Sequence, residues 1–247
     1  MPAIPAWPPR SLPRLFVHTA LAEDARVELD AGQANYLGNV MRLGVDAELL
    51  VFDGQSGEWL ARIAEAAKKR MTLKVERRTR EAEAAPDLWL AFAPVKRAQT
   101  DWLVEKATEL GAARLLPVIT QRTIAERVKL ERLQAIAIEA AEQCGRTRLP
   151  EIAEGVSLRQ LLKSCEEGRS LYFADERDGA APASALRPGP AMILVGPEGG
   201  FTDEERELVR AAPNAVAISL GPRILRAETA ALAALAVYMA VAGDWAG

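Results

Sequence analysis

Val195-Gly196-Pro197-Glu198-Gly199-Gly200-Phe201-Thr202 is the stretch of the chain that decides its fold. It follows the apolar run 191–195, which is typical of a buried strand, and it precedes a helix whose capping box is formed by Thr202 and Glu205. Its glycines allow the backbone to approach a ligand closely or to take a positive φ. In open α/β sheets, ligands bind at this carboxyl end of the strands. Taken alone, the stretch fits a strand-to-helix turn without a ligand equally well.

A second glycine-bearing turn follows about 20 residues later. Ser219-Leu220-Gly221-Pro222 ends the apolar run 215–218, and Ile224-Leu225-Arg226-Ala227-Glu228-Thr229-Ala230 leads into a helix of small residues. Neither turn carries the G-x-G-x-x-G or G-x-x-x-x-G-K-[ST] fingerprint of a nucleotide-binding loop. Two such turns in successive strand–helix units predict a small ligand held by backbone amides and carbonyls.

The charged side chains around the second turn leave two interpretations open. Arg226, between an apolar pair and the small residues of the helix start, either forms an ion pair with Glu198 or Glu228 or contacts a ligand. Glu228 and Thr229 lie where a side chain can hydrogen-bond the amides of the first helical turn. Their capping role and a ligand contact are both compatible with the sequence.

Residues 1–82 predict a small β-barrel. Short apolar runs bounded by turn residues are typical of strands. They lie at 15–17, 47–52, 59–63 and 71–75. Asp53-Gly54 indicates a hairpin, with a longer loop through Gly57. One short helix is expected over 33–43, and the polar, proline-marked segment 81–86 forms the joint to the next domain.

Residues 83–247 alternate between strand and helix patterns. Strands are expected at 88–92, 115–119, 170–173, 191–195 and 215–218. Helices are expected from Thr100, as the N-cap, to Leu110, over 130–143, from Thr202 onward and over 227–242. This alternation predicts an α/β domain with a parallel sheet that is covered by helices on both faces.

The composition is that of an ordinary globular protein. The 247 residues are 49% apolar and 26% charged, with a net charge of −3. The proline-broken N-terminus lacks the apolar segment of a signal peptide, and the apolar run 230–242 is too short to span a bilayer. Cys144 and Cys165 have neither disulfide nor metal-ligand spacing, and His18 is the single histidine. We therefore expect a reduced, cytoplasmic protein that needs no metal and no membrane.

A local excess of basic residues lies between Ala61 and Arg80, where the sequence has eight basic residues and two acidic ones. The eight are Arg62, Lys68, Lys69, Arg70, Lys74, Arg77, Arg78 and Arg80. Such a patch can neutralise several phosphates and support salt-dependent docking of RNA. A solvated strand face is the other interpretation of the same charges.

Two upstream motifs complete a resemblance that covers nearly the whole chain. Lys96 with Trp102–Gly111 resembles a K…KATELG stretch, and 139–150 resembles E-Q-C-G-R-x-R-x-P. Arg14-Leu-Phe and 40–44 also match. Together with the two glycine turns, these motifs are closely similar to those of the SPOUT class of RNA methyltransferases. Within that class, they resemble the bacterial family that methylates uridine N3 in 16S ribosomal RNA.

The resemblance implies a PUA-like RNA-binding barrel followed by a SPOUT domain with a C-terminal trefoil knot, in a homodimer. It implies that the two turns bind S-adenosylmethionine (SAM), without a metal, and that the partner is 16S ribosomal RNA or the small ribosomal subunit. The implied cofactor contacts are Leu194, Gly196, Pro197, Glu198, Gly199, Gly200, Ser219, Leu220, Gly221, Ile224, Leu225, Arg226, Glu228 and Thr229. The implied RNA contacts are Arg14, Arg42, Lys68, Lys69, Arg70, Lys96, Gln143 and Arg146.

The implied reaction is a direct displacement at the sulfonium methyl carbon, which is mainly a task of positioning. N3 must lose its proton, and negative charge spreads onto the uracil oxygens. Arg226 and Arg146 are the candidates for stabilising that charge, and Glu198 is the candidate for assisting deprotonation. Because N3 lies on the Watson–Crick edge, the base must be unpaired or extruded. Tyr36 stands where relatives often carry histidine, which leaves that RNA contact open.

Three alternative functions make different demands on the sequence. A SPOUT enzyme that acts on another RNA atom or another RNA would share these motifs. An RNA-binding module without catalysis predicts disrupted glycine turns, whereas both turns are intact here. A nucleotide-linked oxidoreductase predicts a glycine fingerprint after the first strand of the second domain, and the segment 92–96 has none.

Overall fold

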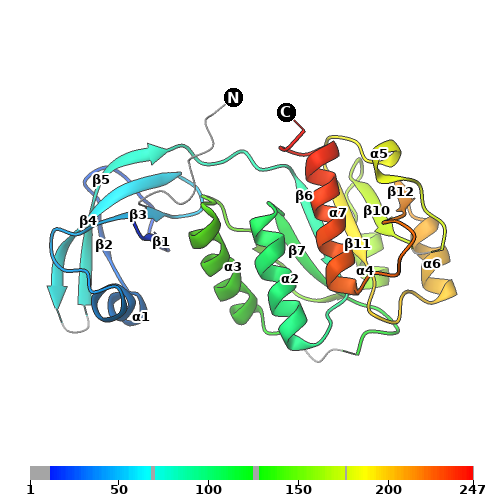
Figure 1. Cartoon of the computed structure of the whole chain (residues 1–247), viewed down its shortest axis with the longest axis horizontal. Helices are drawn as coiled ribbons and strands as arrows, with labels where there is room; N and C mark the ends of the chain where they lie inside the picture. The colour runs from blue at the N-terminus through cyan, green and yellow to red at the C-terminus, as the bar shows by residue number, and fades with distance from the viewer. Residues whose placement is uncertain (1–11, 68–69, 125–127, 176, 247) are drawn as a thin grey trace. The chain divides into compact units, whose positions relative to one another are not determined.

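The computed structural model describes residues 12–67, 70–124, 128–175 and 177–246 (Figure 1). They form two compact units. The first comprises the chain up to Glu83 together with Gly145–Arg148, and the second comprises Ala84–Cys144 and the chain from Leu149 onward. The sequence predicted a division after residue 82, with no sign that a later segment belongs to the first unit. Lys68 and Lys69, two of the predicted RNA contacts, lie outside the described residues.

The first unit is built on a five-stranded sheet in the order β1-β3-β4-β5-β2. Its strands are β1 (Arg14–Phe16), β2 (Arg26–Glu28), β3 (Glu48–Phe52), β4 (Glu58–Ala67) and β5 (Arg70–Arg80). Four of these were predicted. The sequence missed β2, which has three residues and buries only Val27. The predicted helix over 33–43 is shorter and starts earlier, as α1 (Ala31–Asn35) followed by the π-helical turn η1 (Tyr36–Val40).

Alternating apolar residues give this sheet its buried face, since successive side chains of a strand point to opposite sides. The core includes Leu49 and Val51 of β3 and Leu73 and Val75 of β5, all fully buried. The predicted hairpin between β3 and β4 is confirmed. Its Gly57 has φ +97°, and a Cβ there would meet the Arg80 carbonyl oxygen at 2.2 Å, so that only glycine fits.

The second unit contains a parallel sheet in the order β12-β10-β11-β6-β7-β8, with β9 paired to β7. The strands are β6 (Leu88–Phe92), β7 (Arg114–Ile119), β8 (Glu151–Ile152), β9 (Val156–Ser157), β10 (Ser170–Ala174), β11 (Ala191–Val195) and β12 (Ala215–Ile218). The helices are α2 (Arg97–Glu109), α3 (Leu130–Cys144), α4 (Leu158–Lys163), α5 (Pro182–Ala185), α6 (Asp203–Arg210) and α7 (Ala227–Val241).

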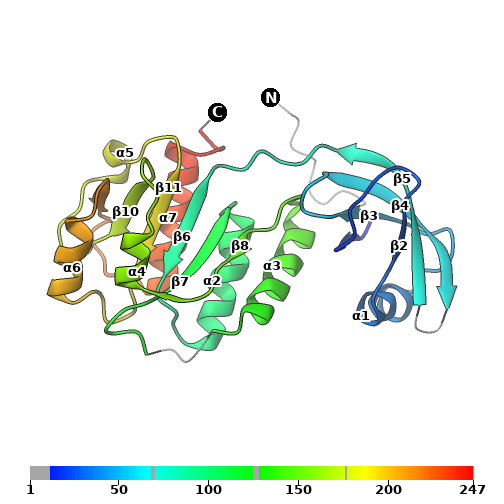
Figure 2. The same cartoon turned by 180° about the vertical axis from the view of Figure 1, so that it is seen from behind.

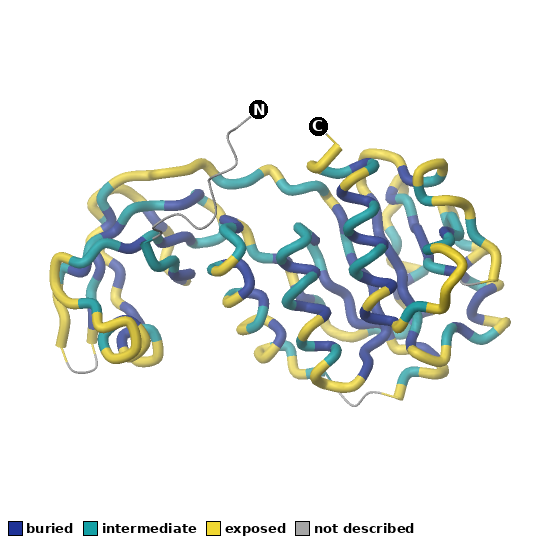
Figure 3. Tube along the Cα trace, viewed as in Figure 1, coloured by how far each residue is buried: buried dark blue, intermediate teal, exposed yellow. Residues whose placement is uncertain are grey.

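Helices cover both faces of this sheet, as predicted. In Figures 1 and 2, α2, α3 and α7 lie on one face and α4 and α6 on the other. The central strand β11 contributes side chains to the cores on both faces of the sheet. Ile193 packs in the core under α2 and α7, while Met192 and Leu194 pack in the core under α4 and α6. All five residues of β11 are buried (Figure 3). A strand buried on both sides is continuously apolar for this reason.

One predicted helix start is wrong. Thr100 was expected to cap α2, but the helix begins at Arg97 with Lys96 as its N-cap. Thr100 is buried within the first turn, and its hydroxyl donates to the Val95 carbonyl oxygen at 3.1 Å. The hydroxyl therefore ties the helix back to the end of β6. The short elements α4, α5, β8 and β9 were not predicted, and the trefoil knot stays a prediction. No helix in the described ranges has both the length and the apolar character to cross a membrane.

Candidate functional site

A cavity of about 450 Å³ lies at the carboxyl ends of three neighbouring strands in the second unit. Strand β10 pairs in parallel with both β11 and β12, so that their ends meet at one edge of the sheet. The lining residues are Ala174, Asp175, Val195, Gly196, Pro197, Glu198, Gly199, Gly200, Phe201, Leu220, Gly221, Arg223, Ile224, Leu225, Arg226, Ala227 and Ala230. The two glycine turns singled out in the sequence therefore form the walls of one cavity.

The first turn, residues 196–200, is tightly constrained. Pro197 is buried, and its carbonyl oxygen accepts a hydrogen bond from the amide of Gly200 at 2.8 Å. Gly200 has φ +67°, which favours glycine. A Cβ on Gly196 would approach the ring of Phe201 to 3.1 Å. The turn is thus held by its own backbone and by the aromatic ring beneath it.

The helix that follows this turn is held at its start by Thr202 and Glu205. The predicted capping box is confirmed: the Thr202 hydroxyl accepts from the Glu205 amide at 3.2 Å, and the buried Glu205 carboxylate accepts from the Thr202 amide at 3.0 Å. The same carboxylate accepts from the Gln121 amide at 2.7 Å. Arg122 donates to the Gly199 carbonyl oxygen at 2.7 Å. The loop after β7 therefore braces the first turn.

Asp175 is a wall residue of the cavity that sequence reasoning missed. Its carboxylate is fully buried and forms ion pairs with Arg206 and, at 2.9 Å, with Arg210. Burial, together with the nearby positive charges of Arg210 and Arg122, lowers the pKa of Arg206. The available signal was its position directly after a strand, because polar residues at strand ends in such sheets line ligand sites.

The second turn has far less support from the rest of the protein. Gly221 has φ +100°, and Ile224 is 91% exposed. Arg226, the N-cap residue of α7, is exposed and lines the cavity. It forms no ion pair with Glu198 or Glu228, all three being described residues. Of the two interpretations of Arg226, the structure therefore favours a ligand contact over an internal ion pair.

Four predicted cofactor contacts do not line the cavity. Leu194 is fully buried in the core under α4 and α6, and Ser219 lies just before the lining segment. Thr229 is exposed on α7. Glu228 is buried in the first turn of α7, and one of its carboxylate oxygens has no hydrogen-bond partner in the described chain. The helix N-terminus favours this negative charge.

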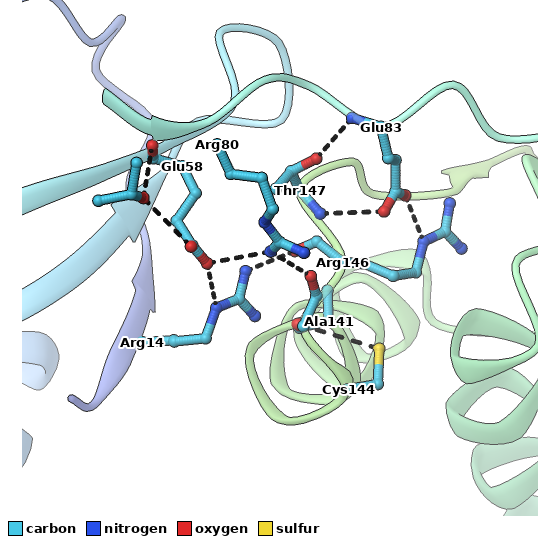
Figure 4. A network of polar contacts seen from close by, with 10 residues as sticks. Arg14, Glu58, Arg80, Glu83, Ala141, Cys144, Arg146 and Thr147 are labelled. Carbon is cyan, nitrogen blue, oxygen red and sulfur yellow. Dashed lines mark hydrogen bonds and ion pairs between the residues drawn. The ribbon is translucent and has the colours of Figure 1, made fainter. Parts of the chain in front are cut away.

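Arg146 was predicted to act in catalysis and RNA binding, and Arg14 was predicted to contact RNA. The two residues lie together in the first unit (Figure 4). Arg146 is buried and donates to Glu83 at 2.8 Å. Arg14 donates to Glu58 at 2.7 Å and to the Arg146 carbonyl oxygen at 2.8 Å. Arg80 donates to the Gly145 carbonyl oxygen at 2.6 Å. These contacts anchor residues 145–148 in the first unit, and the predicted catalytic and RNA-binding roles stay predictions.

The other predicted RNA contacts are exposed. They are Arg42, Arg70, Lys96 and Gln143. The basic stretch around β4 and β5 is partly neutralised by neighbouring acids. Five of its six described cations form ion pairs with carboxylates, namely Arg62, Arg70, Lys74, Arg78 and Arg80. Exposed pairs of this kind are weak, so they do not prevent phosphate binding. Arg77 forms no such pair with any described residue.

The described residues hold no group of three or more histidine, cysteine or acidic side chains that could bind a metal ion. The cavity instead offers backbone groups of two glycine turns and an apolar wall that includes Val195, Phe201 and Leu225. Its volume falls within the range of roughly 300–1,000 Å³ that is usual for small-molecule sites. It can hold a ligand of nucleoside size.

Comparison with known families identifies the class of protein. The RNA methyltransferase domain family matches residues 82–239, and the RNA methyltransferase PUA domain family matches residues 29–76. The chain belongs to this family of RNA methyltransferases. The predicted fold class, an α/β SPOUT domain with a parallel sheet preceded by a PUA-like domain, is confirmed.

Individual relatives span almost the full chain. Ribosomal RNA small subunit methyltransferase E of Rickettsia conorii is 34% identical over 90% of this chain and 93% of its own length. The Bacillus subtilis protein of the same name is 30% identical over 82% of this chain and 85% of its own. A Neisseria gonorrhoeae protein of that name, solved bound to S-adenosyl methionine, has a TM-score of 0.87 at 29% identity, covering 95% of this chain and 99% of its own. A Legionella pneumophila protein solved with SAM has a TM-score of 0.86 at 30% identity, covering 94% and 99%.

Proposed function

We propose that this protein transfers a methyl group from SAM to N3 of a uridine in 16S ribosomal RNA. The observation that carries the proposal is the cavity at the ends of β10, β11 and β12, whose walls are both glycine turns. Its size, apolar wall and backbone groups fit a nucleoside-containing cofactor. Relatives that share the fold over almost the whole chain were solved with SAM. The N3 target rests on the resemblance of the motifs.

Different residues of this chain take different roles in such a reaction. Bound SAM supplies the electrophilic methyl group. Arg226 lies at the cavity wall and its guanidinium forms no ion pair with any residue that the structure describes, so it can stabilise negative charge on the uracil oxygens. Glu198 is exposed at the same wall, where a carboxylate can accept the N3 proton. The constrained first turn keeps one wall in place, which is the positioning that displacement requires.

The partners follow from the same proposal. The PUA-type first unit, with exposed Arg42, Arg70 and Arg77, docks the RNA. Tyr36 is 44% exposed, so its ring is available to stack on a base. Lys96 and Gln143 contact the RNA from the second unit, and Arg146 is the second candidate, beside Arg226, for contacting the RNA and stabilising negative charge. The enzyme works as a homodimer on small ribosomal subunits in the cytoplasm.

The proposal is tested by methyl transfer from radiolabelled SAM to small ribosomal subunits that lack the modification. Digestion and nucleoside chromatography then identify the methylated nucleoside. Label in 3-methyluridine supports the cofactor, the reaction and the target atom together. Label in another nucleoside retains the enzyme class and rejects the N3 target. SAM binding without transfer to free 16S RNA or to subunits rejects the catalytic proposal.

A further inference from the structure

A second cavity of about 470 Å³ opens in the second unit beside the first turn of α2. The lining residues are Pro94, Val95, Lys96, Arg97, Thr100, Asp101, Ile124, Val128, Lys129, Arg132 and Leu133. Its volume again falls within the usual range for small-molecule sites. The sequence pointed to Lys96 as an RNA contact but not to the cavity itself, because its walls come from the end of β6, the loop after β7 and the starts of α2 and α3.

A smaller cavity of about 90 Å³ lies between this second cavity and the first one, which we call the cofactor cavity because the proposed function places SAM there. It shares Lys96 and Ile124 with the second cavity. It shares Glu198 and Gly199 with the cofactor cavity. Arg122 completes its wall. A ligand in the second cavity therefore lies next to the first glycine turn, on the side that carries Glu198.

The second cavity is strongly basic. Arg132 is neutralised by Asp101, to which it donates two hydrogen bonds of 2.9 and 2.6 Å. Lys96, Arg97 and Lys129 are exposed and pair with no acidic side chain in the part of the chain that the structure describes. Lys96, the N-cap of α2, and Arg97, its first residue, both line the cavity, so the positive end of the helix dipole lies at its wall. The cavity is suited to a ligand with negative charge.

We propose that this second cavity binds backbone phosphates of the RNA strand whose target base enters the cofactor cavity. The inference rests on the proposed function and adds the place where the strand is held. Displacement requires nucleophile and methyl donor to be bound side by side. An extruded base keeps its phosphates outside the reaction cavity, within reach of a neighbouring cationic site. Lys96, Arg97 and Lys129 supply contacts that position the strand without reading its sequence.

A second copy of the chain is the competing occupant of this surface. Burying three cations at an interface between two copies is costly unless the partner surface supplies carboxylates in the right places. Phosphates neutralise the same cations directly and release counterions. Ile124 is 90% exposed at the shared rim, where its apolar side chain can contact a ribose or base that leads from one cavity to the other. The charges therefore favour RNA.

The double variant Arg97→Gln/Lys129→Gln tests the proposal in the full-length protein. We expect KM for unmodified small ribosomal subunits to rise roughly tenfold, because two phosphate contacts are lost. The Kd for SAM, measured by calorimetry, remains that of the wild type, since neither residue lines the cofactor cavity. Lys163→Gln is the matched control, because Lys163 is an exposed lysine at the end of α4 outside all of these cavities.

An activity-independent measurement separates the two proposals. The Kd for a fluorescent single-stranded RNA is measured against salt concentration, and the double variant is expected to lower the slope of log Kd by about 0.7 per lost contact. An unchanged slope with unchanged KM overturns the phosphate site. If the double variant changes the oligomeric state measured by sedimentation but neither KM nor the salt slope, the phosphate site is overturned and a second copy of the chain is the occupant. If the wild type transfers no methyl group, the proposed function fails. The salt dependence of RNA binding then decides by itself whether the second cavity binds phosphates.

Discussion

The two glycine turns that face each other across the cofactor cavity differ in how the protein supports them. The first, residues 196–200, is tied by the Pro197 carbonyl oxygen, by Arg122 and by the capping box that follows it. The second, residues 219–226, is exposed along most of its length, and its Gly221 amide donates to the Ser219 hydroxyl at 3.4 Å. One wall of the site is therefore held by several contacts within the protein, and the other wall by few.

This asymmetry suits an enzyme that must bind a cofactor and release a product. A preorganised wall costs no conformational entropy on binding. A sparsely supported wall allows the ligand to enter and leave, at the cost of ordering it each time. Substitutions of the groups that brace the first turn should therefore change the stability of the fold, whereas substitutions in the second turn should mainly change ligand binding and catalysis.

The largest expected effect is on catalysis and lies in the second turn. Arg226→Ala is expected to lower kcat by about 10²-fold through loss of charge stabilisation in the transition state. The melting temperature should stay within error, because Arg226 is exposed and has no ion pair with Glu198 or Glu228. Arg226→Lys should recover part of the rate. Arg159→Ala, an exposed arginine of α4, is the control for the loss of a positive charge. Near-normal turnover of Arg226→Ala removes this residue from the mechanism.

The next effect is on stability and concerns Glu205, which braces the first turn from α6. Glu205→Ala is expected to lower the free energy of unfolding by about 2–3 kcal/mol, because it leaves the amides of Gln121 and Thr202 without their acceptor. Glu228→Ala is the matched change beside the second turn. It should cost less than about 1 kcal/mol, since one oxygen of that buried carboxylate lacks a partner already. Urea denaturation of both variants measures the difference, and equal losses would contradict the asymmetry of support.

A matched pair of glycine substitutions compares the turns directly. Gly200→Ala and Gly221→Ala both place a side chain at a positive φ, +67° and +100° respectively. Such strain costs about 1–2 kcal/mol. The braced first turn cannot relax, so that Gly200→Ala should lower the free energy of unfolding by this amount. The exposed second turn can relax in the free protein, and Gly221→Ala should mainly raise the Kd for SAM. Calorimetry and urea denaturation on both variants decide whether the two effects separate in this way.

The smallest effect concerns the helix starts that follow the two turns. Thr202→Ala removes the side-chain cap of α6 and should cost about 1 kcal/mol of stability. Thr202→Ser keeps the cap and should remain close to the wild type. Thr229→Ala changes an exposed residue of α7 and should stay within about 0.5 kcal/mol. A loss for Thr229→Ala as large as that for Thr202→Ala would show that the second helix start is also braced.

Local sequence determined most of the elements and the two glycine turns that line the cofactor cavity. The apolar strands, the capping box of Thr202 and Glu205, and both glycine turns are features of neighbouring residues. Periodicity and backbone preference act over such short spans. The wall formed by residues 196–200 and 220–226 was therefore predictable before any contact was known.

Only the tertiary structure decided how distant residues meet. Asp175 joins the cavity because β10 lies between β11 and β12 in the sheet, and Arg122 reaches Gly199 from the loop after β7. Residues 145–148 belong to the first unit because Arg14, Arg80 and Glu83 bind them. The second cavity likewise gathers cations from α2 and α3. These contacts depend on the order of the strands in the sheet and on segments distant in sequence folding back against one another, which no local sequence pattern encodes.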